Sequence, residues 1–159
     1  MTDTAAERLR TERRRLDALG VSLRTVAVGY ATVDLDEAEA QLRLTLGARG
    51  VRAGADDALL GARTRIVETT DGALLVLLEP CTEGRLAASL ARFGHGAVVE
   101  YLEVADEGTD VAAAAALAGI RLSAPAHGPF GPSRLVVGGR AWGPHVVLVD
   151  RPGAATIES

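Results

Sequence analysis

The sequence has little or none of several residue types that carry common kinds of chemistry. Its 159 residues contain one cysteine, Cys81, and all 17 basic residues are arginine. A single cysteine excludes an intramolecular disulfide and a cysteine-rich zinc site, and the absence of lysine excludes a Schiff-base mechanism. Aromatic residues make up 3% of the chain, which argues against a pocket that binds its ligand by ring stacking.

Charge and hydropathy exclude further classes of protein. The net charge of −4 argues against a nucleic-acid partner, because nucleic-acid-binding domains carry a clustered basic face. No apolar run approaches the roughly 20 residues of a membrane span, and the polar start MTDTAAERLR lacks the apolar stretch of a signal peptide. We therefore expect a cytoplasmic protein with no membrane partner, of a length that suits one compact domain.

The most informative feature present is an approximate internal repeat in which both halves end in an apolar strand. The first copy runs from TVAVGYATVDLDEAEAQL to ALLVLLEP, and the second from AVVEYLEVADEGTDVAAAAALAGIRL to PHVVLVDRP. Each copy has the pattern of a strand, a helix, a weak strand, a strand and a final apolar strand. The repeat predicts an α+β fold in which two βαβββ modules form a cupped mixed sheet.

The repeat also divides the chain into segments. We expect an N-terminal helical extension at 1–22, a first module at 23–80, a linker helix within 81–96, a second module at 97–151 and a flexible tail at 152–159. The extension begins with a capping box from Thr4 to Glu7 and is the first candidate for oligomer contacts. In the first module, residues 47–61 are interpreted as a loop with at most one weak strand.

The centre of the chain resembles a known superfamily. The blocks LLVLLEP, GRLAASLARFGHG, VVEYLEVAD, LAGIRL and AHGPFGP look like those of methylmalonyl-CoA epimerases, members of the vicinal oxygen chelate (glyoxalase and bleomycin-resistance-like) superfamily. The resemblance covers residues 24 to 150. It implies a sheet cupped around a small-molecule cavity, here called the cup, and a homodimer.

In metal-dependent members of this superfamily, each module supplies a histidine from its first strand and a glutamate from its last strand to a divalent ion. The resemblance places Ala27, Val76, Val99 and Val147 at these four positions. Aliphatic side chains cannot replace the oxygen and imidazole ligands that such ions require. We therefore expect no metal and no other cofactor, and interpret the four residues as part of a substrate-binding surface.

Polar side chains near the lost ligands are the candidates for catalysis. Strand alternation places Tyr101, Glu103 and His145 on the same faces as Val99 and Val147. A histidine beside a carboxylate or a phenol can act as a general acid or base, because imidazole titrates near neutral pH. We interpret these three residues as the catalytic set.

Substrate-binding residues are expected around this set. Arg63 or Arg65, together with Arg134, are predicted to point into the cup from the third strands, where an arginine can bind a carboxylate or polarise a carbonyl. Trp142, the only tryptophan, is interpreted either as a wall of the cavity or as part of a dimer seam.

Three further residues are not assigned to the catalytic set: two of them have two possible roles each, and the third has a structural role. Glu100 alternates to the helix side, where an arginine would pair with it, unless a bulge turns it into the cup as a fourth catalytic candidate. Tyr30 also alternates to the helix side and is interpreted as a core residue. His95 follows a glycine in a loop, where it either gates the cavity or faces solvent.

These features leave the function open between classes. One is a metal-independent enzyme, of isomerase, epimerase, cyclase or lyase type, that moves a proton on a carbonyl-containing small molecule, such as a polyketide-like or acyl-thioester intermediate of secondary metabolism. The alternative is a resistance-type protein that sequesters a hydrophobic natural product without turnover. A third possibility is a structural subunit whose cup is filled by its own side chains.

Overall fold

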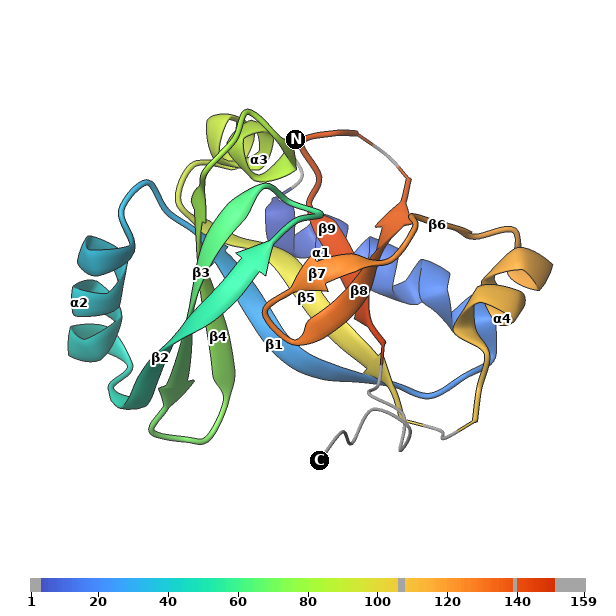
Figure 1. Ribbon diagram of the computed structural model, residues 1–159, viewed down its shortest axis with the longest axis horizontal. Helices are drawn as coiled ribbons and strands as arrows, with labels where there is room; N and C mark the ends of the chain where they lie inside the picture. The colour runs from blue at the N-terminus through green and yellow to red at the C-terminus, as the bar shows by residue number, and fades with distance from the viewer. Residues whose placement is uncertain (1–3, 106–107, 139, 151–159) are drawn as a thin grey trace.

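A computed structural model describes residues 4–105, 108–138 and 140–150 (Figure 1). The helix α1 (Ala5–Arg15) and the 3-10 turn η1 (Leu16–Leu19) come first. The first module then consists of β1 (Leu23–Ala31), α2 (Leu35–Thr45), β2 (Ala48–Asp57), β3 (Ala62–Thr69) and β4 (Leu74–Pro80). After the linker helix α3 (Arg85–Phe93), the second module consists of β5 (Gly96–Val104), α4 (Val111–Ala118), β6 (Arg121–Leu122), β7 (Ala126–Gly128), β8 (Gly131–Val137) and β9 (His145–Val149).

The strands form one mixed sheet in which the two modules meet side by side. Its order is β2-β3-β4-β1-β5-β9-β8-β6, and β7 pairs with β8. The first and last strands of each module are parallel, β1 with β4 and β5 with β9, whereas β1 and β5 run antiparallel and join the modules. This arrangement confirms the predicted α+β fold with two βαβββ modules and an extra N-terminal helix.

The two faces of the sheet are covered differently. One apolar cluster fills the cup and includes residues from both modules. On the outer face, α2 contacts β3 and β4, whereas α1 contacts β5 and β9. A second cluster there joins Leu16 and Leu19 to α4 and the second module, and a third lies under α2 around Leu42. Figure 1 shows α1 behind the sheet and α2 beside it.

Local sequence signals explain where several helices begin. At α1, the Thr4 hydroxyl accepts a hydrogen bond from the Glu7 N–H, and the Glu7 carboxylate accepts one from the Thr4 N–H, which satisfies two otherwise unpaired backbone donors. Asp34 caps α2 and Asp110 caps α4 through their side-chain oxygens. The helix signals in the sequence were therefore reliable because they act over three or four residues.

Residues 47–61, interpreted as loop-like with at most one weak strand, contain one strand that is longer than expected. Residues 48–57 form β2, which lies at one end of the sheet and pairs with β3. Most of its side chains are exposed, so the strand lacks the apolar alternation that marks a half-buried strand in a sequence. The predicted tail at 152–159 lies outside the described residues. Within the described part of the chain, no helix is long and apolar enough to cross a membrane.

Candidate active site

The cup contains the four positions that the resemblance assigns to metal ligands. Val76 and Val99 lie opposite Gly29 on the two strands that flank β1. Tyr101 lies opposite Ala27 on one side and Val147 on the other. Ala27 is 2% exposed, and Val76, Val99 and Val147 are fully buried, so solvent does not reach these positions.

Side chains of the protein itself pack closely around Gly29 in the cup. A Cβ atom added at Gly29 would lie 2.7 Å from the Val99 Cβ and 2.8 Å from the Leu78 Cδ1. Real Cβ atoms do not approach carbon atoms this closely, so even a methyl group would require the neighbours to move. Side chains of the chain itself therefore occupy the space next to Gly29, and the small-molecule cavity expected in the cup stays a prediction.

A backbone contact between the modules closes the cup further out. The Ala58 N–H, just after β2, donates a 2.9 Å hydrogen bond to the His127 carbonyl in β7. This contact brings the hairpin of β7 and β8 onto the end of β2. The cup is consequently enclosed by both modules.

The residues at the family metal position do not fit a divalent ion. The four aliphatic side chains offer no oxygen, nitrogen or thiolate ligand. Elsewhere in residues 4–105, 108–138 and 140–150, no three His, Cys, Asp or Glu side chains are grouped so that they could hold one. These four positions therefore supply no ligand to a metal ion.

A buried hydrogen bond between the modules is the main polar feature of the cup. The Tyr101 hydroxyl, on β5, donates to the Asp57 Oδ2, at the end of β2, over 2.8 Å. The other carboxylate oxygen, Oδ1, accepts from the Leu60 N–H over 3.1 Å. Tyr101 is fully buried and Asp57 is 1% exposed, so both partners depend on this network for their hydrogen bonds.

Burial governs the protonation of this pair. Desolvation raises the pKa of Asp57, and hydrogen bonds from Tyr101 and from the Leu60 and Leu59 backbone oppose that rise. Desolvation and the nearby Asp57 charge hold the pKa of Tyr101 well above its usual value. Tyr101 therefore stays a hydrogen-bond donor at neutral pH, and Asp57 is a stronger base than an exposed aspartate once it is ionised.

Phe130 covers the Tyr101 ring from the turn between β7 and β8. The two rings meet edge to face, with centroids 5.4 Å apart and planes at 73°, a favourable geometry for aromatic pairs. Phe130 is partly exposed, whereas Tyr101 is not. Access to Tyr101 from solvent would therefore require this turn to move.

His145 begins β9 on the cup side, where it lies opposite Val99. It is 4% exposed, and its Nε2 has no hydrogen-bond partner within the described part of the chain. Desolvation and the neighbouring Arg85 charge lower its pKa to about 4, although hydrogen bonds to the backbone of Ala141 and Arg85 partly oppose this. The imidazole is neutral at neutral pH, and its catalytic role stays a prediction.

The two glutamates predicted near the site have structural partners. Glu103 accepts hydrogen bonds from the Arg24 guanidinium on the neighbouring strand. Glu100 accepts a 3.0 Å hydrogen bond from the Thr25 hydroxyl, so the partner predicted for it, an arginine, is replaced by a threonine. The strand register shifts between Thr25 and Ala27, close to both pairs.

The two arginines predicted to point into the cup do not do so. Arg65 forms ion pairs of 2.8 Å with Asp36 and 2.9 Å with Glu39, both on α2. Arg134 donates to the Ser123 carbonyl, and its neighbours Ser133 and Leu135 are buried instead. The prediction was wrong because alternation in β3 and β8 puts the arginines on the outer face.

Trp142 packs against the linker helix. Its carbonyl accepts a 2.7 Å hydrogen bond from the Ser89 hydroxyl, and its ring meets Phe93 edge to face. The guanidinium carbons of Arg92 and Arg8 lie 4.7 Å and 5.1 Å from the ring centroid, within cation–π range. These contacts account for Trp142 within the chain.

Sequence reasoning missed Asp57. It belongs to the segment interpreted as a loop, and nothing local separates it from its exposed neighbour Asp56. Its partner Tyr101 is 44 residues away. The sequence contained only an indirect indication. A tyrosine predicted to be buried in the cup needs a hydrogen-bond acceptor, and an aspartate elsewhere in the chain can supply one.

Comparison with solved structures identifies similar proteins. A variant of Streptomyces coelicolor methylmalonyl-CoA epimerase in complex with 2-nitronate-propionyl-CoA is 27% identical, with a TM-score of 0.65 over 83% of this chain and 100% of that one. A methylmalonyl-CoA epimerase in complex with methylmalonyl-CoA and NH4+ is 27% identical, with a TM-score of 0.66 over 83% and 97%.

The epimerase from Mycobacterium tuberculosis is 24% identical, with a TM-score of 0.68 over 82% of this chain and 90% of that one. At this identity the likeness shows the fold. No protein-family model matches the sequence, and no curated protein sequence matches it either.

Proposed function

From the vicinal oxygen chelate framework that this chain shares with methylmalonyl-CoA epimerases, we propose that the protein is an isomerase of the epimerase type. Its substrate is a carbonyl-containing small molecule, with an acyl thioester as the first compound to test. The observation that carries the proposal is the Tyr101–Asp57 hydrogen bond. Tyr101 lies opposite Ala27 and Val147 in the sheet, two of the positions that the resemblance assigns to metal ligands.

The pair can perform proton transfer without a metal ion. The ionised Asp57 carboxylate would remove the proton next to the substrate carbonyl, so that the carbon–hydrogen bond breaks and its electron pair moves to the carbonyl oxygen. Once Asp57 has taken up the proton, the single O–H of Tyr101 would turn from Asp57 to that oxygen and stabilise its negative charge. Protonation of the carbon by water on the opposite face, with the proton on Asp57 released to solvent, completes an epimerisation, whereas return of the proton from Asp57 to the same face gives exchange without inversion. The raised pKa of Asp57 favours this role, because it brings the base closer to neutral pH.

Turnover on this site has a structural condition. The substrate would have to displace Phe130 and open the contact between Ala58 and His127, since both close the cup. Loop movements that admit substrate and then exclude water are common in enzymes. The hairpin of β7 and β8 is the element that would move.

The proposal is tested by hydrogen exchange on the substrate. Methylmalonyl-CoA is incubated with the protein in D2O with EDTA present, and deuterium incorporation is followed by mass spectrometry. We expect exchange above the uncatalysed rate that persists in EDTA. Tyr101→Phe and Asp57→Asn should each lower the exchange rate about 100-fold or more, as expected for loss of an oxyanion donor or a general base.

Tyr30→Phe is the matched control, because Tyr30 lies on the outer face and is 39% exposed; its exchange rate should equal that of the wild type. Circular dichroism establishes that each variant is folded. Exchange that EDTA abolishes would contradict metal independence, and exchange that survives Tyr101→Phe unchanged would remove the pair from the mechanism.

Ligand binding without turnover is the second candidate function, because Tyr101 already donates its one O–H to Asp57 and neither side chain is accessible to solvent. An acyl thioester that raises the melting temperature of the wild type but undergoes no exchange would identify this function. The homodimer, the cytoplasmic location and a substrate from secondary metabolism stay predictions from the sequence.

A further inference from the structure

The helices on the outer face pack mainly on the strands at either side of β1. α2 contacts β3 and β4, and α1 contacts β5 and β9, while β1 lies between β4 and β5 in the sheet. The outward side chains of β1, Val28 and Tyr30, therefore lie in a gap between the two helices. Tyr30 is 39% exposed, which corrects its interpretation as a core residue.

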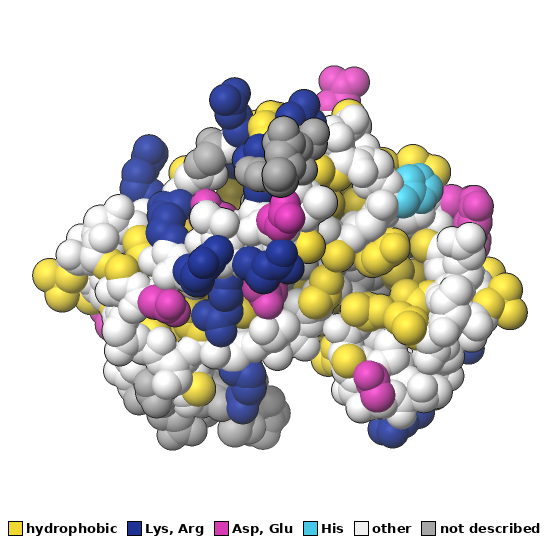
Figure 2. Space-filling view, turned by 180° about the vertical axis from the view of Figure 1, so that it is seen from behind, with side chains coloured by type: hydrophobic (Ala, Val, Ile, Leu, Met, Phe, Trp, Pro, Cys, Tyr) yellow, Lys and Arg dark blue, Asp and Glu magenta, His cyan; other side chains and the backbone are white. Residues whose placement is uncertain are grey.

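This gap contains a pocket of about 310 Å³, here called the α2 pocket. Small-molecule sites usually enclose about 300–1,000 Å³, so the volume suits a small ligand. At about 30 Å³ per non-hydrogen atom, the share of volume that a molecule of liquid water takes, it holds about ten such atoms. Figure 2 shows the hollow from outside, with apolar side chains gathered in it and a histidine near its edge.

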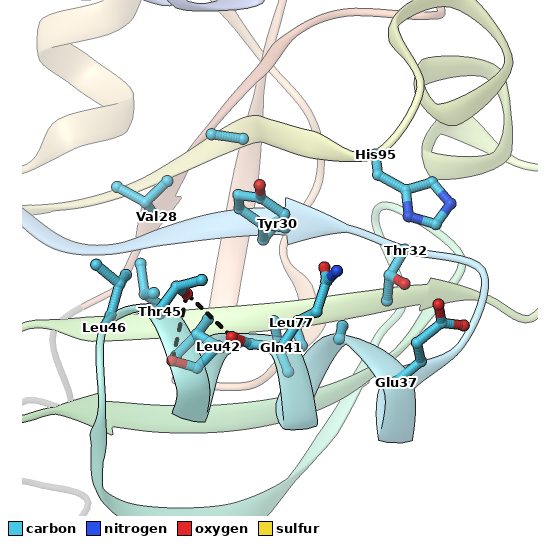
Figure 3. A pocket seen from close by; sticks show the side chains of 13 residues that line it. Val28, Tyr30, Thr32, Glu37, Gln41, Leu42, Thr45, Leu46, Leu77 and His95 are labelled. Carbon is cyan, nitrogen blue, oxygen red and sulfur yellow. Dashed lines mark hydrogen bonds between the residues drawn. The ribbon is translucent and has the colours of Figure 1, made fainter.

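The α2 pocket has an apolar part and a polar end. Aliphatic side chains from the sheet and from α2 form its floor and one end: Val28, Leu42, Leu46, Leu75 and Leu77. Figure 3 shows Thr32, Glu37 and His95 together at the other end, with the Gln41 amide pointing toward the space between α2 and β1. Such a pocket suits a molecule with an apolar body and one polar head.

Charge decides which kind of head group fits. Glu37 lies in the first turn of α2 and lines the pocket. Its acidic neighbours are engaged, since Asp34 caps the helix and Asp36 pairs with Arg65. Within the described residues, no arginine lies within ion-pair distance of Glu37, so its charge is available to a ligand.

We propose that the α2 pocket binds a small amphipathic amine. The apolar body of the ligand would lie on the aliphatic floor, and its ammonium group would donate hydrogen bonds to the Glu37 carboxylate and the Gln41 amide oxygen. The pocket lies on the face of the sheet opposite the Tyr101–Asp57 pair, because Tyr30 and Val28 alternate with Gly29 and Ala27 along β1. The proposal is thus independent of the function proposed for the cup.

The test compares three probes of equal chain length that differ in their head group. Octylamine, octanol and octanoate are titrated into the 15N-labelled full chain at pH 7, and amide shifts of α2 and β1 report binding. An alkylamine is protonated at this pH, as a lysine side chain is. We expect octylamine to bind about three- to tenfold more tightly than octanol, and octanoate to bind most weakly.

Two pairs of variants separate the head group from the apolar body. Glu37→Gln should remove the preference for octylamine over octanol, whereas Glu83→Gln, which removes an exposed carboxylate away from the pocket, should keep it. Ala38→Leu adds bulk to the pocket lining and should weaken all three probes. Ala40→Leu, on the same helix but outside the lining, should leave them unchanged.

Three results would overturn the proposal. Octanoate binding as tightly as octylamine would exclude recognition by Glu37. Shifts that fall outside α2 and β1 would place the ligand elsewhere. The third result is that no probe binds, that sedimentation shows a dimer, and that Tyr30 and Leu46 are protected from solvent. Together these observations would assign the gap to a second copy of the chain.

Discussion

At the residue scale, Gly29 lies where three packed side chains converge in the cup. Val99, Leu78 and Tyr101 all lie within 3.2 Å of the place that a Cβ atom would take. A larger residue at this position would therefore force its neighbours to move, although the backbone is an ordinary β conformation.

We expect Gly29→Ala to lower the free energy of unfolding by about 1–3 kcal/mol, the usual cost of overpacking a core. Gly50→Ala is the matched control, because it lies on an exposed strand position with nothing within 4 Å of the added methyl; it should stay within about 0.5 kcal/mol of the wild type. Urea denaturation measures both. Equal stabilities of the two variants would show that the cup has room for a methyl group at this position.

His145 makes stability depend on pH. Its pKa is about 4 in the folded chain and about 6.5 when unfolded, so between these values the unfolded chain binds the extra proton. The stabilisation is fully present above about pH 6.5 and is lost as the pH falls toward about 4. Asp57 has the opposite effect on the free energy of unfolding. Because its pKa is raised in the folded chain, the folded chain binds this proton first as the pH falls, which favours the folded state.

We expect the free energy of unfolding to fall by about 1–2 kcal/mol between pH 7.5 and pH 5, since each pKa unit corresponds to about 1.4 kcal/mol. In the His145→Gln variant this fall in the free energy of unfolding should be much smaller. The His95→Gln variant, which changes an exposed histidine, should show the same fall as the wild type. Urea denaturation at the two pH values tests this. An identical fall in His145→Gln would mean that another group titrates.

At the scale of elements, the N-terminal helix is part of the fold of the second module. Leu16, at the junction of α1 and η1, is fully buried and packs in the same cluster as Leu102, Ala115 and Leu148. The predicted oligomer contact is therefore not needed to explain why this extension is apolar on one side. Its apolar stripe covers the outer face of β5 and β9 within the chain.

Leu16→Ala should lower the free energy of unfolding by about 2–5 kcal/mol, because it leaves a cavity in this cluster. Leu44→Ala, on the exposed side of α2 and 87% exposed, should change it by less than about 0.5 kcal/mol. Thermal and urea denaturation measure both. A loss below about 1 kcal/mol for Leu16→Ala would show that α1 and η1 are loosely attached.

At the scale of the whole molecule, the two modules share one sheet but have unequal helix cover. The second module has α1, η1 and α4 over its outer face, whereas the first has α2. The uneven cover leaves the α2 pocket between them, while the meeting of β2 with the hairpin of β7 and β8 closes the cup. The α2 pocket therefore lies on the outer face, and the polar pair lies buried on the inner one.

The sequence by itself determined the repeat, the α+β class, most helix starts and the aliphatic character of the family metal positions. These follow from apolar periodicity and from caps that act within a few residues, which do not depend on distant partners. Strand alternation likewise placed Tyr101 and His145 on the cup side. It could not place Arg65 or Arg134, because the inward side of β3 and β8 depends on pairing with other strands.

Only the tertiary structure decided how far the cup closes and which polar groups meet. The Tyr101–Asp57 pair joins residues 44 apart, and the α2 pocket lies beside α2 because α1, from the start of the chain, packs mainly on β5 and β9 of the second module. Both depend on the packing of distant segments, which leaves no periodic mark on the local sequence.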